Sequence, residues 1–225
     1  MGLRDRAIHS TVVRAIDHAV TTRWEDALRR AEATTGTIPE RVDQITSRLA
    51  TELAAVGAAT GGVAALPGIG TVASLATSAA DVGWMTTRAC DVVMAIGAIH
   101  GRTDAAPEIR AAWVAAVLGY GDGAAGALPH ILAAEARAAR EQAGGRLSGG
   151  SLAALNQGFG RNLATRWLMR RLATSVGKAL PFGIGAVVGG IANRASARTI
   201  ARHADLMFAT IGAPSVGAAR PATWS

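Results

Sequence analysis

The sequence predicts an all-α protein, a compact bundle of about six to eight helices. The chain has 225 residues and half of them are apolar, which is enough for one sizeable core. Alanine, the best helix former and a poor strand former, supplies much of that apolar content. Aromatic residues make up only 4%, which disfavours a β-sandwich.

The N-terminal pattern is that of an amphipathic helix over residues 3–33. Apolar side chains recur there at every fourth position with charges between them: Ile8, Val12, Ile16, Val20, Trp24 and Leu28. Thr37, followed by Pro39 and Glu40, has the pattern of a capping box and predicts the start of a second helix. Its apolar stripe is formed by Val42, Ile45, Leu49, Leu53 and Val56.

The second helix runs into residues 53–80, a stretch of 28 residues without a charged side chain. A Pro/Gly break divides this stretch into the two arms of a helical hairpin: Leu66, Pro67, Gly68 and Gly70. A membrane-spanning helix needs about 20 strongly apolar residues, whereas each arm is shorter and rich in small residues, so we expect no full crossing. The second arm continues to about His100 and ends at Gly101 as a C-cap.

Asp104 and Pro107 open the next helix, and a Gly-rich segment, residues 119–123, separates it from a helix over residues 125–142. After a Gly/Ser loop, a long helix from Ser151 meets a second Pro/Gly break: Leu180, Pro181, Gly183 and Gly185. An arm to about Ile211 follows it. Both breaks contain Leu-Pro and Gly-Ile-Gly, which indicates a weak internal repeat of two Leu-Pro hairpins.

We therefore divide the chain into three parts. Residues 1–52 form amphipathic helices that pack on the core, residues 53–212 form the main helical domain, and residues 213–225 form a disordered tail.

Two blocks of this sequence resemble the bacterial EcsC family over roughly residues 60–210. The first block contains Leu66-Pro67-Gly68, Asp81, Arg88, Ile96, His100-Gly101, Pro107-Glu108 and the run 116–119. The second contains Lys178, Leu180-Pro181, Gly185, Gly189-Gly190, Asn193, Ala204 and Phe208. The family is named for a protein encoded beside an ABC transporter linked to secretion. The resemblance implies a helical protein that acts at or near the cytoplasmic membrane, and it implies no particular reaction.

The net charge of +7 is concentrated in residues 136–225, which carry 12 basic and 2 acidic side chains. Cations flank the uncharged segment 179–192, and Trp167 is suited to a membrane interface. The predicted membrane-binding or lipid-binding residues are Arg161, Arg166, Trp167, Arg170, Arg171, Lys178, Arg194, Arg198 and Arg202. The alternative to membrane binding is that these arginines form the solvent-exposed face of a helix whose other side packs in the core. Nucleic acid is disfavoured, because no recognition motif or interleaved aromatic residues accompany the charge.

No catalytic, metal or cofactor site is predicted. Gly68-x-Gly70 lacks the preceding β-strand of a dinucleotide-binding loop, and no His/Cys pattern completes a metal site. His100 near Asp91 or Asp104 offers an acid/base pair, but a helix-end His is more often a capping cation. Asp81 ends the uncharged stretch, and we interpret Asp81, Arg88 and Asn193 as a buried polar tie between the two repeats.

The predicted function is non-catalytic. We expect a cytoplasmic protein, peripherally associated with the inner membrane, whose partner is an anionic membrane surface or a membrane transport or secretion complex. Charges within residues 1–20 argue against a signal peptide, and the single cysteine, Cys90, favours a reducing compartment. The alternative is a soluble helical homo-oligomer, or an apolar-ligand-binding protein, with its hairpins buried.

Overall fold

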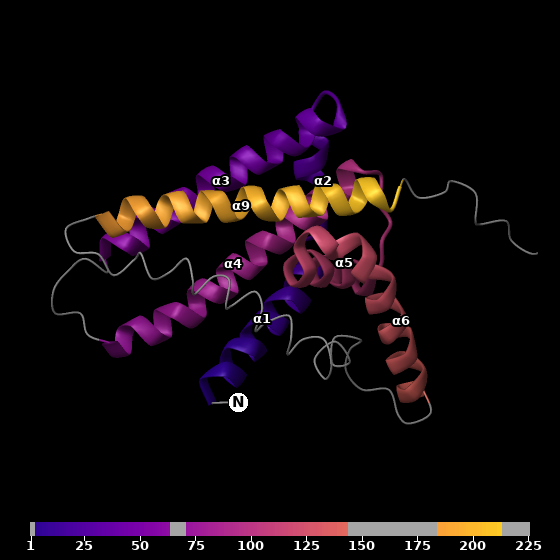
Figure 1. Ribbon diagram of the computed structural model, residues 1–225, viewed down its shortest axis with the longest axis horizontal. Coiled ribbons are helices and arrows are strands. Elements are labelled where there is room, and N and C mark those ends of the chain that lie inside the picture. The colour runs from indigo at the N-terminus through magenta and orange to yellow at the C-terminus, as the bar shows by residue number, and fades with distance from the viewer. Residues whose placement is uncertain (1–2, 64–70, 144–183, 213–225) are drawn as a thin grey trace, which may run out of the picture.

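The computed structural model describes residues 3–63, 71–143 and 184–212 (Figure 1). Within these ranges, it describes only the backbone of residues 3–10, 53, 56–63, 71–82, 135, 138–143 and 184–193. These ranges hold seven α-helices and one short 3-10 helix, with no strand among them, so the all-α class is confirmed. The elements are α1 (Leu3–Thr22), α2 (Trp24–Glu32), α3 (Ile38–Val63), α4 (Thr71–Ile99), α5 (Pro107–Tyr120), η1 (Gly121–Gly123), α6 (Ala124–Ala143) and α9 (Ile184–Thr210).

The single helix predicted for residues 3–33 is wrong, because the chain bends at Arg23 between α1 and α2. Arg23 has φ −111° and ψ 10°, outside the helical range. The hydroxyls of Thr21 and Thr22 donate to carbonyls four residues back, a pattern that often bends helices. The bend preserves the spacing of the apolar residues, so periodicity gave no sign of it.

The Glu40 side of the capping box predicted at the start of α3 is confirmed. The Glu40 carboxylate oxygen Oε2 accepts hydrogen bonds from the Thr37 backbone N–H at 2.8 Å and from the Thr37 hydroxyl at 2.9 Å. These contacts satisfy a backbone donor that the helix itself cannot pair. The helix then turns Val42, Ile45 and Leu49 into the core, as predicted.

The predicted C-cap at Gly101 is also confirmed. Gly101 has φ +80°, a left-handed conformation that glycine adopts without a Cβ clash. Its N–H donates to the Ala98 carbonyl at 2.9 Å, and the N–H of Arg102 donates to the Gly97 carbonyl at 3.0 Å. This pair of bonds is the Schellman motif, and it stops α4 at the expected position.

The centre of the described structure is α4, which contacts α1, α2, α3, α5 and α9. Every residue from 89 to 99 is buried. Next to α4, the Trp113 ring of α5 meets the Phe208 ring of α9 edge to face, with centroids 5.1 Å apart. Gly97 lies directly beneath both rings, so its lack of a side chain lets them approach the helix backbone.

The long helix α9 lies against α3 and runs in the opposite direction (Figure 1). Its other contacts are with α4, α5, α6 and η1. The helix therefore ties the N-terminal helices to the α5–α6 pair. The predicted boundary at residue 52 falls inside α3, which continues to Val63. The internal repeat stays a prediction, since its second break, apart from Gly185, lies outside the described residues.

We predict that Gly97→Ala destabilises the protein by about 1–3 kcal/mol, the usual cost of overpacking. A Cβ at this position would lie 3.0 Å from Phe208 Cζ and 3.0 Å from Trp113 Cζ3, and rigid rings on both sides cannot move away cheaply. The control is Gly126→Ala on α6, where a Cβ meets nothing within 4 Å. It is expected to be neutral or to stabilise by up to about 1 kcal/mol. Urea unfolding measures both, and equal effects would contradict the close packing.

Candidate functional site

Three arginines form a row on the outer face of α9. Arg194, Arg198 and Arg202 are four residues apart, and all three are exposed. We call them the basic stripe. The opposite face of the helix is buried in the bundle by Ala197, Ala201, Ala204, Met207 and Phe208. Packing of this small-residue face therefore turns the cations outward.

One end of the basic stripe contacts η1. Arg202 Nη2 lies 3.2 Å from Asp122 Oδ1, and His203 Nε2 lies 3.3 Å from the same oxygen. Leu206, the next residue in the four-residue spacing, is 45% exposed, a high value for a large apolar side chain. The outer face of α9 thus combines three cations with one apolar side chain.

The remaining predicted membrane-binding residues lie outside the described residues: Arg161, Arg166, Trp167, Arg170, Arg171 and Lys178. So do most residues of the two helix breaks: Leu66, Pro67, Gly68, Gly70, Leu180, Pro181 and Gly183. Gly185 lies in the first turn of α9. The described helices bracket the first break, because α3 ends at Val63 and α4 begins at Thr71.

Uncharged helix ends gather at one end of the molecule. In Figure 1 the C-terminal end of α3 and the N-terminal ends of α4 and α9 point the same way, away from α5 and α6. The sequence at these ends, residues 53–63, 71–80 and 184–192, contains no charged residue. Arg194 of the basic stripe follows two residues after this range. Tertiary structure therefore brings segments from both predicted hairpins to the same side of the protein.

A second cluster of charge is centred on Asp91, which lies on α4 and is only 3% exposed. Arg23 binds its carboxylate with two parallel hydrogen bonds of 2.7 Å from Nε and Nη2. Arg88 Nη1 donates to the same carboxylate at 3.0 Å. Two guanidinium groups therefore compensate one buried carboxylate, and burial without such partners would be costly.

The cluster extends to α2 and α3 through Glu52. Arg88 Nη2 lies 3.2 Å from Glu52 Oε2 without a hydrogen bond between them, and Arg30 Nη1 lies 3.6 Å from Glu52 Oε1. The Arg88 guanidinium also lies over the Trp84 ring. The chain of contacts joins α2, α3, α4 and the bend at Arg23, so we interpret it as a structural tie.

Sequence analysis missed Asp91 as the centre of a polar tie, although Asp91 is the one charged residue in the apolar run 89–99. Arg88, which was predicted to join such a tie, is part of this one. The side chains of Asp81 and Asn193 lie outside the described residues, so their participation stays a prediction.

His100 pairs with neither Asp91 nor Asp104. The partners considered from the sequence for an acid/base pair are therefore wrong. Its Nε2 lies 2.9 Å from Asp205 Oδ1 of α9, and its ring stacks on Phe208 with centroids 5.8 Å apart. His100 therefore joins the end of α4 to α9. Sequence spacing cannot reveal a partner 105 residues away.

Cys90 is fully buried beside Asp91, and desolvation, followed by the nearby carboxylate, raises the pKa of its thiol. A thiol that resists ionisation is a poor nucleophile and a poor metal ligand. Among the described residues, no group of three or more His, Cys, Asp or Glu side chains is placed to hold a metal ion.

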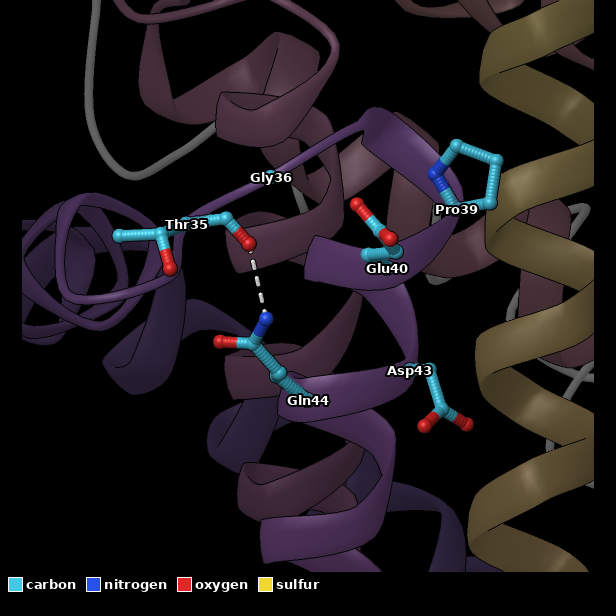
Figure 2. Close-up of a pocket in the computed structure, with 6 residues that line it drawn as sticks. All are labelled: Thr35, Gly36, Pro39, Glu40, Asp43 and Gln44. Carbon is cyan, nitrogen blue, oxygen red and sulfur yellow. Dashed lines mark hydrogen bonds between the residues drawn. The ribbon is translucent and has the colours of Figure 1, made fainter.

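An open surface hollow of about 690 Å³ lies where α3 begins (Figure 2). It is lined by Thr35, Gly36, Pro39, Glu40, Asp43 and Gln44. Two of its polar side chains already have partners, since Glu40 accepts from Thr37 and Gln44 Nε2 donates to the Thr35 carbonyl at 2.8 Å. We interpret the hollow as the outside of a helix cap.

No helix in the described ranges combines the length and apolar content that a membrane crossing requires.

Comparisons with models of known protein families, with curated proteins and with solved structures found no match. The resemblance to the EcsC family therefore rests on the sequence pattern alone.

We predict that Asp91→Asn lowers the free energy of unfolding by about 3 kcal/mol, the cost of breaking a buried ion pair. This value is at the lower end of the usual range, because the partners Arg23 and Arg88 are partly exposed. Asp26→Asn is the control, since Asp26 pairs with Arg29 on the surface and such pairs contribute less than about 1 kcal/mol. Free energies of unfolding in urea test the difference. If Asp91→Asn lowers the free energy of unfolding no more than Asp26→Asn does, the tie at Asp91 does not stabilise the protein.

The capping box predicts a pH dependence. The pKa of Glu40 lies below its ordinary value. The main cause is the hydrogen bond from the Thr37 backbone N–H, and the bond from the Thr37 hydroxyl contributes less. The ionised carboxylate therefore stabilises the fold above the unfolded-state pKa of about 4.3, and this stabilisation is lost as the pH falls through the lower folded-state pKa.

Glu40→Ala should consequently lower stability at pH 7, and the gap from the wild type should close in strong acid. Asp43→Ala, which removes another exposed carboxylate one turn further along α3, is the matched control. Denaturant unfolding at a series of pH values measures both. A gap for Glu40→Ala that is constant with pH would contradict the assignment.

Proposed function

We propose that this protein binds anionic membrane surfaces through the outer face of α9 and performs no catalysis. The observation that carries the proposal is the basic stripe, three exposed arginines on one helix face. Guanidinium groups bind phosphate with paired hydrogen bonds, so this face suits phospholipid headgroups.

The position of the basic stripe supports the same proposal. It follows the uncharged first turns of α9 in the sequence, and the uncharged ends of α3, α4 and α9 point to one end of the molecule (Figure 1). A surface that lies on a membrane combines cations at headgroup level with uncharged residues that enter the interface. In this arrangement the α9 cations and the predicted hairpins meet the same bilayer.

The expected affinity is modest. A Lys or Arg near an anionic surface contributes about 1 kcal/mol, so three arginines supply about 3 kcal/mol. This is enough for reversible association that falls with salt and is strengthened by further cations. Peripheral binding at the cytoplasmic face of the inner membrane fits this strength, and the resemblance to the EcsC family supports that location and a transport or secretion complex as neighbour.

We predict that the double variant Arg194→Gln/Arg198→Gln binds anionic vesicles about 30-fold more weakly than the wild type, the equivalent of two lost contacts of about 1 kcal/mol. The matched control is Arg14→Gln/Arg137→Gln, which removes the same charge from exposed positions on α1 and α6. Co-sedimentation with phosphatidylserine-containing vesicles at low and high salt is the measurement, with pure phosphatidylcholine vesicles as the neutral reference.

Equal losses in the two double variants would mean that net charge, and not the α9 face, drives binding. No wild-type binding to either kind of vesicle would refute the proposal. Concentration-dependent self-association in that case would favour the soluble oligomer instead.

A further inference from the structure

One member of the basic stripe is held by a carboxylate of the same chain. Arg202 Nη2 lies 3.2 Å from Asp122 Oδ1, and His203 Nε2 lies 3.2 Å from Arg202 Nη2 and 3.3 Å from the same carboxylate oxygen. Within the described residues, neither Arg194 nor Arg198 forms an ion pair. The three cations of the basic stripe therefore differ in availability, and Arg202 is the one already engaged.

The backbone holds Asp122 in position. Asp122 is the middle residue of η1, a three-residue turn between α5 and α6, with Gly121 at φ +58° on one side and Gly123 on the other. Gly121 is buried and η1 contacts α9, so the turn is seated on the helix that carries the basic stripe. The carboxylate is thus presented to Arg202 by a short, fixed segment.

The side chains themselves stay accessible. Asp122 is 66% exposed and Arg202 is 59% exposed. An ion pair between exposed groups contributes little and is screened by salt, so an incoming anion can replace it. A phosphate group carries more acceptor oxygens than a carboxylate and takes a guanidinium with paired bonds, so it is a suitable competitor.

We propose that Asp122 and Arg202 form an autoinhibitory latch on the basic stripe, in which Asp122 occupies Arg202 until a lipid phosphate headgroup displaces it. This inference rests on the proposed membrane binding and adds a regulation to it. With the latch closed, Arg202 is neutralised and a negative charge stands at one end of the basic stripe. Membranes with few anionic lipids are then disfavoured, and binding rises more steeply as the anionic fraction increases.

The test is a vesicle titration in which the phosphatidylserine fraction is increased in steps. Asp122→Asn removes the competing charge and is expected to bind about fivefold more tightly at low anionic fractions, the equivalent of one released Arg contact. Asp104→Asn is the matched control, because it removes the same charge from an exposed position in the α4–α5 connection. Asp122→Ser repeats the test with a different side chain, and circular dichroism verifies that each variant keeps its helix content.

A second background separates a latch from simple repulsion. Arg202→Gln removes the guanidinium that Asp122 holds in the latch, so adding Asp122→Asn should then bring no more gain than adding Asp104→Asn. A full fivefold gain in that background would show that Asp122 acts without Arg202 and would overturn the latch.

The outcomes distinguish this inference from the function on which it rests. If the wild type binds anionic vesicles through Arg194 and Arg198, but Asp122→Asn and Asp104→Asn behave alike, the latch alone is refuted. If neither the wild type nor Asp122→Asn binds anionic vesicles, the proposed membrane binding is refuted together with it. Binding by Asp122→Asn without any binding by the wild type would refute the proposed membrane binding, because the native protein would then not bind.

Discussion

The described fold depends on how one buried carboxylate is neutralised. Asp91 lies in the C-terminal third of α4, where every residue from 89 to 99 is buried. A charge in such a place needs partners with good geometry, and it obtains them from Arg23 and Arg88. Arg23 reaches it from the bend between α1 and α2, while Arg88 continues to Glu52 on α3. These contacts connect the bend between the first two helices to α4, and α4 to α3.

Close packing of small residues is the second constraint, and it explains why so few aromatic residues suffice. Gly97 lets the Trp113 and Phe208 rings contact the backbone of α4, while Ala197, Ala201 and Ala204 let α9 lie close to its neighbours. Buried arginine complements this packing at helix ends. Arg110, whose pKa is lowered by burial, donates to the Val20 carbonyl near the end of α1 and covers the Trp24 ring. The interior is therefore tied by cations as well as filled by alanine.

The outer face of α9 follows from this inner packing. Because the packed residues of α9 face the bundle, the intervening arginines face outward. The same helix carries Asp205, which meets His100, and His203, which meets Asp122. Together with the packed face, these contacts fix how α9 is rotated about its own axis. The direction in which the basic stripe faces is therefore a result of this packing.

Local features could be predicted from the sequence because they depend on neighbours in the chain. The all-α class, the capping box at Thr37 and Glu40, the C-cap at Gly101 and the outward spacing of Arg194, Arg198 and Arg202 are of this kind. The tertiary structure alone decided which charges meet across long separations, as in Arg23 with Asp91, His100 with Asp205 and Arg202 with Asp122. Periodicity specifies which face of a helix is apolar, whereas the approach and rotation of two helices result from packing over the whole core. A bend that keeps the apolar spacing, such as the one at Arg23, consequently leaves no trace in the pattern.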